Sequence, residues 1–479
     1  MLTTLAAPAF AGTWYIENGD ITVKAGETKG TNKVSQGENP EVEDTNTVIT
    51  NSDKDKASSN TVTIEAKDKD DKVEVTLKDV NIDTSSRSEA AVSVTGEGNT
   101  NIELDGDNAL KSDIYSSGIY SSGSLTISGG ENDSLTAQGG SGADGIYSSG
   151  SLTISGGTVT ANGGSGGGGD GGDGIWSSGG VTISGGSTVT ANGGDGKDDY
   201  GGDGIRSDSG DVTISGGTVK AAGGDSKDGY GGDGIRSGGV TISGGTVNAA
   251  GGNGGKVGGY GICSFARVAI SGGTVNAAGG NGKNSNGGSD GIISNDIDLS
   301  GSLELTAKAG RPNGKAISWA GSELDLDDIK DKLDPGAKVT ATDANGETKQ
   351  VSVPRPVEPE KPVIPEESSS SSGGGSAAPS APAFSLPGLT VTDKDGQRIS
   401  YTSTQSGNTL TVCVGRFTAS FHISLAALRQ LRAEGIDTIT FQTILCSTTL
   451  SVDELLAMGG EDAEAVLTHR FTDSSLTVG

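Results

Sequence analysis

Short runs of alternating apolar and polar residues recur through the middle of the chain, and glycine ends each run. Three runs make one unit: Gly-Ile with a Ser/Gly turn, then (Leu/Val)-Thr-Ile-Ser-Gly-Gly, then Thr-Val-x-Ala-x-Gly-Gly. Units begin 27 to 30 residues apart, at Gly118, Gly145, Gly174, Gly204, Gly234, Gly261 and Gly291. A fixed period of this length indicates a stacked repeat array, and alternation over a few residues is typical of a strand. The pattern therefore predicts three short strands per unit.

The apolar residues of successive units fall into four inward-facing columns. They are Ile119, Ile146, Ile175, Ile205, Ile235, Ile262 and Ile292; Leu125, Leu152, Val181, Val212, Val240, Val268 and Ile297; Ile127, Ile154, Ile183, Ile214, Ile242 and Ile270; and Val159, Val189, Val219, Val247 and Val275. Each unit supplies only about five inward apolar residues, too few for a core of its own, so units must stack at ~4.8 Å. We predict an all-β fold, a three-sided parallel β-helix (a solenoid).

Two other repeat folds fit less well. A propeller blade needs ~40–45 residues and four strands, and a leucine-rich repeat needs an L-x-x-L-x-L motif with a helical half. Neither pattern is present. The Gly-Gly pairs after the second and third strands fit corners that require a positive φ, where a β-carbon costs energy.

The repeats lie within residues 12–353, which we predict to be the β-helix with its two caps. Upstream alternation at Val62/Ile64 and Val92/Val94 lacks the Gly-Ile marker, as expected for atypical terminal coils. Downstream, 327–333 is predicted to be a short capping helix, and 338–351 a hairpin around Asn345-Gly346.

The remaining chain divides in two. Residues 354–387 are rich in Pro, Ser and Gly and predict a linker. Residues 388–479 predict a small α+β module, in which Ser424 caps an amphipathic helix that ends at Gly435 and a second helix lies near 453–458.

The first residues indicate a compartment. Residues 1–11 end in Ala9-Phe10-Ala11, a signal-cleavage pattern, and we interpret them as a signal-peptide remnant whose start lies upstream. The alternative is an ordinary N-terminal strand. Export would make the protein secreted or place it at the cell surface.

The three cysteines are too few for a disulfide scaffold and lack metal-ligand spacing. Cys413 and Cys446 could pair outside the cell. Cys263 would then be a buried, unpaired thiol.

Composition narrows the partners. Glycine supplies 83 of 479 residues, which disfavours long helices. The net charge of −28 repels phosphate backbones, so nucleic acid is not expected as a partner. No run of 18 apolar residues exists, so no membrane span is expected. We expect a monomer.

Residues suited to catalysis are sparse. Both histidines, His422 and His469, lie in the C-terminal module, so no serine of the β-helix has a histidine to activate it. We expect no enzyme activity. A pectate-lyase-type polysaccharide lyase, which needs only an Arg or Lys base and Ca²⁺, stays open as an alternative. The evenness of the coils disfavours it, because catalytic clefts arise from unequal loops.

One outward-facing column suggests binding. The residue after each inward isoleucine points to solvent, and in five successive units it is Tyr120, Tyr147, Trp176, Arg206 and Arg236. Spaced at ~4.8 Å, these residues would form a strip of three aromatic rings leading to two guanidinium groups. Aromatic faces stack on sugar rings, and arginine binds carboxylates bidentately. The strip predicts a surface for an extended polysaccharide, including one with uronic acids. Alternatively, these side chains only stabilise the sheet.

Aspartates form a second column just before the Gly-Ile pairs: Asp144, Asp173, Asp203, Asp233 and Asp290, with Tyr260 interrupting. Carboxylates ~5 Å apart repel by ~0.8 kcal/mol in water and ~3 kcal/mol at an effective dielectric of 20. Such a row needs hydration, amide hydrogen bonds or cations. Calcium is the predicted cation, held by the first four. Residues 193–200 and 168–175 also match the Gly-Gly-x-Gly-x-Asp repeat of calcium-binding rolls. Plain solvated turns are the alternative.

Two segments carry a family resemblance. DGIYSSGSLTISGGTVTANGG (144–164) and NTNIELDGDNAL (99–110) resemble secreted bacterial carbohydrate-binding-domain proteins with a right-handed parallel β-helix. Some of these bind acidic plant polysaccharides and calcium. The likeness covers roughly 12–350 and rests on repeat texture. It implies a right-handed helix and a secreted or cell-surface, non-catalytic carbohydrate-binding protein. A passive surface spacer or adhesin is the other alternative.

Overall fold

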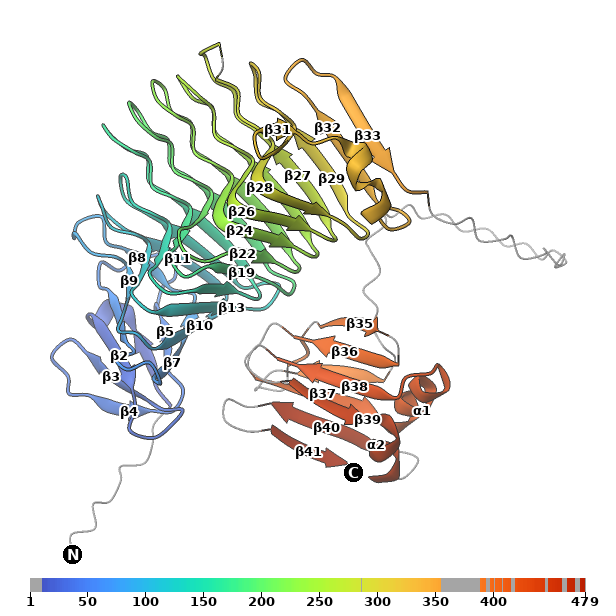
Figure 1. Ribbon diagram of the computed structural model, residues 1–479. Helices are drawn as coiled ribbons and strands as arrows, with labels where there is room; N and C mark the ends of the chain where they lie inside the picture. The colour runs from blue at the N-terminus through green and yellow to red at the C-terminus, as the bar shows by residue number, and fades with distance from the viewer. Residues whose placement is uncertain are drawn as a thin grey trace, which may run out of the picture.

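The structure is a computed structural model that describes residues 11–285, 287–354, 388–392, 397–399, 401–406, 408–414, 418–443, 447–458, 463–469 and 474–478. The strands from Thr13 to Ser352 stack into an elongated solenoid, in which each coil lies on the next (Figure 1). The predicted signal remnant, apart from Ala11, and the predicted linker, apart from Pro354, lie outside the described residues.

Parallel strands form three columns along the solenoid. The first column is β2 (Ile21–Ala25), β6 (Val62–Glu65), β9 (Val92–Thr95), β12 (Ile119–Ser121), β15 (Ile146–Ser148), β18 (Ile175–Ser177), β21 (Ile205–Ser207), β24 (Ile235–Ile242), β26 (Ile262–Ile270), β28 (Ile292–Leu299) and β30 (Ile317–Trp319). The second is β1 (Thr13–Tyr15), β5 (Val48–Thr50), β7 (Lys72–Lys78), β10 (Asn99–Asp105), β13 (Ser124–Ser128), β16 (Leu152–Ile154), β19 (Val181–Ile183) and β22 (Val212–Ile214). The third is β8 (Asn81–Asp83), β11 (Asp107–Lys111), β14 (Ser134–Gln138), β17 (Thr158–Asn162), β20 (Thr188–Asn192), β23 (Thr218–Ala222), β25 (Thr246–Ala250), β27 (Thr274–Ala278), β29 (Glu304–Lys308) and β32 (Lys338–Thr342).

The register confirms the predicted three-sided parallel β-helix. Ile146 pairs with Ile175, and Ile175 with Ile205, so equivalent residues of successive coils are immediate neighbours. These isoleucines are fully buried, as are the valines of the fourth column. Burying one such side chain contributes roughly 1.5–3 kcal/mol. The core is therefore continuous along the solenoid.

Three coils differ from the prediction of separate first and second strands. β24, β26 and β28 run through the corner and belong to both the first and the second columns. The register between β24 and β26 shifts between Ser237 and Gly239, as at a β-bulge. In these coils the chain passes from the first column to the second within one continuous strand.

The glycine corners are of two kinds, and the prediction was right for only one. After the second strand, Gly157 and Gly217 have φ of 72° and 77°, as expected. After the third strand, neither Gly163 nor Gly194 has a positive φ. A β-carbon on Gly194 would lie 2.2 Å from the carbonyl oxygen of Gly164 in the coil before it. Close backbone packing between coils, rather than a left-handed φ, requires these glycines.

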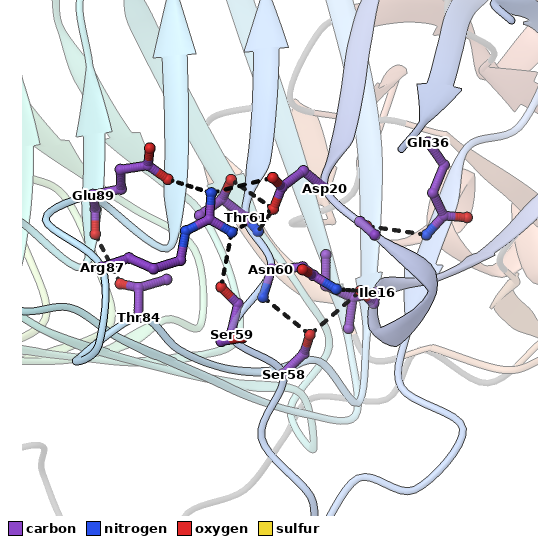
Figure 2. A network of polar contacts seen from close by, with 11 residues as sticks. Ile16, Asp20, Gln36, Ser58, Ser59, Asn60, Thr61, Thr84, Arg87 and Glu89 are labelled. Atoms are coloured by element: carbon purple, nitrogen blue, oxygen red, sulfur yellow. Dashed lines mark hydrogen bonds and ion pairs between the residues drawn. The ribbon is translucent and has the colours of Figure 1, made fainter. Parts of the chain in front are cut away.

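The N-terminal end of the solenoid is closed by antiparallel strands. β3 (Asn32–Gln36) pairs antiparallel with β2 and with β4 (Val42–Asp44), after the short 3₁₀ helix η1 (Ile16–Asn18). Arg87 binds to the start of this cap (Figure 2): its guanidinium contacts Asp20, just before β2, at 2.8 Å, and it contacts Glu89 at 2.7 Å. Covered ends prevent edge-to-edge association of strands.

The C-terminal end has the predicted helix and hairpin. The helix is a 3₁₀ helix, η2 (Leu326–Lys332), which begins one residue before the predicted start and buries Leu326 and Ile329. The hairpin pairs β32 with β33 (Thr348–Ser352). A short strand, β31 (Ser322–Glu323), pairs antiparallel with β30.

The described residues after 387 form a separate apolar cluster with two sheets and two helices. One sheet is β34 (Leu389–Thr392), β37 (Ala419–Ser424), β40 (Glu464–His469) and β41 (Ser474–Val478); the other is β35 (Thr402–Ser406), β36 (Thr409–Cys413), β38 (Thr438–Gln442) and β39 (Ser447–Ser451). The helices are α1 (Leu425–Ala433) and α2 (Val452–Met458). Ser424 caps α1 as predicted. Cys446 lies outside the described residues, so its pairing with Cys413 stays a prediction.

The close packing at Gly194 yields a matched test. Gly194→Ala places its methyl group against the backbone of the preceding coil, so we expect a loss of roughly 1–3 kcal/mol in the free energy of unfolding. Gly186→Ala is the control, because a β-carbon there meets nothing within 4 Å. Urea denaturation of both variants measures the difference. Equal stability of the two would contradict the packing explanation.

Candidate functional site

The five residues of the predicted strip form one continuous column on the outer face of the first strand column. The register pairs Tyr120 with Tyr147, Tyr147 with Trp176, Trp176 with Arg206, and Arg206 with Arg236. Their side chains are half-buried to exposed. The structure therefore brings all five together, and we call them the outward column.

Ring stacking along the outward column limits which surfaces a ligand can reach. Tyr120 and Tyr147 lie 5.2 Å apart with an interplanar angle of 3°, and Trp176 meets Tyr147 edge-on at 5.1 Å. The guanidinium of Arg206 covers Trp176 at 4.8 Å. The facing sides of Tyr120 and Tyr147 are thus covered by each other, and Arg206 covers one face of Trp176. A ligand meets ring edges, hydroxyl groups and the two ends of the stack.

The two arginines of the outward column are held by aspartates. Arg206 Nε donates to Asp208 at 2.8 Å, and one terminal nitrogen lies 3.9 Å from Asp173. Arg236 pairs with Asp233 at 3.5 Å. A guanidinium has five N–H donors, so each of these keeps donors for a further acceptor.

The predicted metal residues form a buried ladder of amide acceptors. One carboxylate oxygen of Asp144 accepts the backbone N–H of Asp173 at 2.7 Å; Asp173 accepts from Asp203, and Asp203 from Asp233, both at 2.6 Å. The ladder continues to Tyr260, which donates its N–H to Asp233. These aspartates are 4–9% exposed. The alternative of plain solvated turns is therefore wrong, and amide hydrogen bonds stabilise the row.

Burial shifts the titration of this aspartate ladder. Removal from water raises the pKa of Asp144 to about 6 and that of Asp233 to about 8. The same cause raises the pKa of Asp173 and Asp203, and the charges of Asp203 and Asp144 add to the rise at Asp173. The amide hydrogen bonds and the arginines act in the opposite direction. The ladder therefore carries less negative charge at neutral pH than its composition suggests.

Within the described residues, no group of three or more His, Cys, Asp or Glu side chains is arranged to hold a metal ion. In the roll-like segment 193–200, Asp195 accepts the backbone N–H of Asp225 at 2.9 Å, whereas Asp198, the aspartate of the repeat pattern, is exposed. Calcium at Asp144, Asp173, Asp203 and Asp233 stays a prediction.

Cys263 follows Arg236 in the register and is buried and free, as predicted. Burial raises the pKa of its thiol to about 12, so it is neutral and unreactive at physiological pH.

The sequence analysis missed a second set of rings. Tyr200 and Tyr230 lie on loops that extend from the corner after the third strand, and their rings stack at 5.0 Å with an interplanar angle of 15°. Backbone bridges join the two loops at these tyrosines. The signal was available, since the two tyrosines are one period apart. We call them the loop tyrosines.

The loop tyrosines and the outward arginines line one groove of about 500 Å³. We call it the arginine groove. Its other lining residues include Asp170, Gly202 and Tyr260. A second hollow of about 410 Å³, on earlier coils, is lined by Tyr115, Tyr120 and Tyr147. Both volumes suit a small-ligand site. A wider hollow of about 760 Å³ beside Ile114 has no aromatic lining, and its Lys111 is paired with Asp83.

Comparison with known proteins supports the fold. A family model described as a β-helix repeat matches residues 152–175, 181–205, 212–235 and 240–262. Neither the curated proteins nor the solved structures gave a match. In the part of the chain that the structure describes, no helix has the length and apolar character needed to cross a membrane.

The aspartate ladder predicts that stability falls as pH rises. A carboxyl group with a higher pKa in the folded than in the unfolded chain makes the folded state bind more protons. The loss begins above the unfolded pKa of ~4 and is complete once pH has passed about 6 for Asp144 and about 8 for Asp233. We expect Tm to fall by roughly 5 °C between pH 5 and pH 9, measured by calorimetry.

Asp233→Asn separates this effect from general charge repulsion. Asparagine keeps an oxygen that can accept the Tyr260 N–H, and we expect it to remove most of the fall in Tm above pH 6. Asp198→Asn, on an exposed loop position, is the control and should keep the wild-type slope. The same slope in both variants would show that the ladder does not cause the pH dependence.

Proposed function

We propose that the protein is a non-catalytic carbohydrate-binding protein, secreted or displayed at the cell surface, that binds an extended polysaccharide along the outward column. The observation that carries the proposal is the arginine groove, which combines aromatic side chains and arginines in one hollow. Sugar-binding sites generally combine apolar ring surfaces with a few fixed polar groups. The repetition of the coils supports a ligand that is itself a repeating chain.

The chemistry of the arginine groove favours a polysaccharide that contains uronic acids. Arg206 and Arg236 present guanidinium donors on neighbouring coils, at the ~4.8 Å spacing of parallel strands. Arginine binds carboxylates in a bidentate geometry. Burial also raises the pKa of the aspartates beside them, which lowers the repulsion of an anionic ligand.

The loop tyrosines contribute aromatic surface to the same groove. Tyr200 is 54% exposed and Tyr230 is 37% exposed, and both line the arginine groove. Lys256 lies 5.4 Å from the Tyr230 ring and adds a positive charge beside it. This combination can hold both the ring and the carboxylate of a uronic acid.

The charge preference can be tested with one polymer in two forms. We expect the full chain to bind polygalacturonate more tightly than its methyl-esterified form, since the ester removes the carboxylate. Arg236→Gln should weaken binding of polygalacturonate by roughly tenfold, about 1.4 kcal/mol, and leave the ester unchanged, measured by titration calorimetry. Arg267→Gln is the control, because Arg267 pairs with Asp296 and Asp298 outside the groove.

Three outcomes of that assay discriminate the alternatives. Release of unsaturated products that absorb in the ultraviolet would identify a lyase, and no binding of either polymer would favour a passive spacer or adhesin. Loss of binding with a chelator would support the calcium prediction.

The aromatic contribution is tested separately. Tyr200→Ala combined with Tyr230→Ala should weaken binding of both polymer forms by at least tenfold, because ring contact does not depend on the carboxylate. Tyr15→Ala is the matched control, as Tyr15 is 42% exposed and does not line the arginine groove. Unchanged affinity in the double variant would remove the loop tyrosines from the site.

A further inference from the structure

The outward column has one end at which an aromatic face is not covered by another ring. Tyr147 stacks on one face of Tyr120. On the opposite side, the register partner of Tyr120 is Ser93, whose side chain is too small to cover a ring. Tyr120 and Ser93 both line the 410 Å³ hollow. The uncovered face of Tyr120 therefore borders an open space, which we call the Tyr120 hollow.

A second aromatic residue stands at the same hollow. Tyr115 is 85% exposed and has a φ of +62°, a left-handed conformation that is uncommon outside glycine. Its ring carbon Cε1 lies 4.0 Å from where a β-carbon of Gly142 would be, so the ring rests beside the next coil. Strained, exposed residues cluster at binding sites. Tyr115 and Tyr120 thus supply two aromatic surfaces to one space.

The polar lining is fixed in place by the N-terminal cap. One carboxylate oxygen of Glu89 contacts Arg87 at 2.7 Å, and Arg87 is in turn held by Asp20 (Figure 2). The hydroxyl of Thr84 donates to the backbone carbonyl of Glu89 at 2.8 Å. These contacts orient Glu89 and engage one of its oxygens, so the other can accept a ligand hydroxyl. Ser93 adds a hydroxyl that can both donate and accept.

The charge of the Tyr120 hollow differs from that of the arginine groove. Among the described residues that line the hollow, Glu89 and Asp144 are acidic and none is lysine or arginine. A uronic acid would bring its carboxylate toward Glu89 and Asp144, and the cation that contacts Glu89, Arg87, is already paired with both Glu89 and Asp20. A neutral sugar would offer hydroxyl donors to the same carboxylates and an apolar ring face to Tyr120.

We propose that the Tyr120 hollow binds one neutral pyranose residue, stacked on Tyr120 and hydrogen-bonded to Glu89. The inference rests on the proposed polysaccharide function, and it adds that the ligand is mixed, with a neutral residue here and uronic acid at the arginine groove. Tyr120 and Arg206 are three coils apart, on the order of 14 Å along the solenoid. One extended chain can therefore reach both places.

The test uses the full chain, four neutral linear hexasaccharides (of glucose, galactose, mannose and xylose) and a hexamer of galacturonic acid, followed by titration calorimetry. We expect at least one neutral hexasaccharide to bind. Tyr120→Ala and Glu89→Gln should each weaken that binding by about tenfold and leave the galacturonate hexamer within twofold. Arg236→Gln should do the reverse.

Two further variants show whether a loss of binding is caused by misfolding. Tyr120→Phe keeps the ring face and should bind as the wild type does, whereas Tyr115→Ala changes an exposed loop and should bind more weakly at an unchanged Tm. Binding of galacturonate without any neutral hexasaccharide, or neutral binding that survives Tyr120→Ala, would overturn this inference alone. Binding of neither class by the wild type would overturn the proposed function as well.

Discussion

Every coil of this protein is held in register by parallel strand pairing at ~4.8 Å, and the rest of the structure depends on that constraint. Because the sequence repeats with nearly the same period, each side chain has its own counterpart as its neighbour. Isoleucine packs on isoleucine, as at Ile175 and Ile205, and serine lies beside serine, as at Ser148 and Ser177. Where the repeat is exact, each position therefore holds a residue type that can pack against a copy of itself.

In the aspartate ladder, this constraint places identical acidic side chains next to one another. Like charges are placed on neighbouring coils and removed from water, which is unfavourable unless each charge is compensated. Asp173 and Asp203 each accept an amide N–H from the following coil, and the arginines beside them supply positive charge. Where the row breaks, Tyr260 takes the position and donates its N–H to the last aspartate before it. The same hydrogen bond thus persists after the side chain changes.

The same constraint limits how an aromatic column can bind. Rings stacked along the solenoid cover one another, so the number of accessible faces does not grow with the number of rings. The candidate binding positions instead lie at interruptions of the column: at Tyr120, where the ring stack ends beside Ser93, and at Arg206, where rings give way to guanidinium groups. The loops that carry Tyr200 and Tyr230 form the arginine groove together with the outer face of the sheet. Irregularities in a regular fold mark its candidate sites.

The sequence alone determined which residues share a column, because a fixed period and the two-residue alternation of strands leave one register that buries the isoleucines. The strip from Tyr120 to Arg236 and the Ser424 cap followed from local pattern. The path of the glycine-rich loops could not be predicted from the sequence, because these loops bury few side chains and so show no apolar periodicity. Only the tertiary structure placed Tyr200 in one groove with the arginines. It alone decided, too, that the aspartates are buried and that Gly194 is required by backbone contact, because both depend on distances between coils.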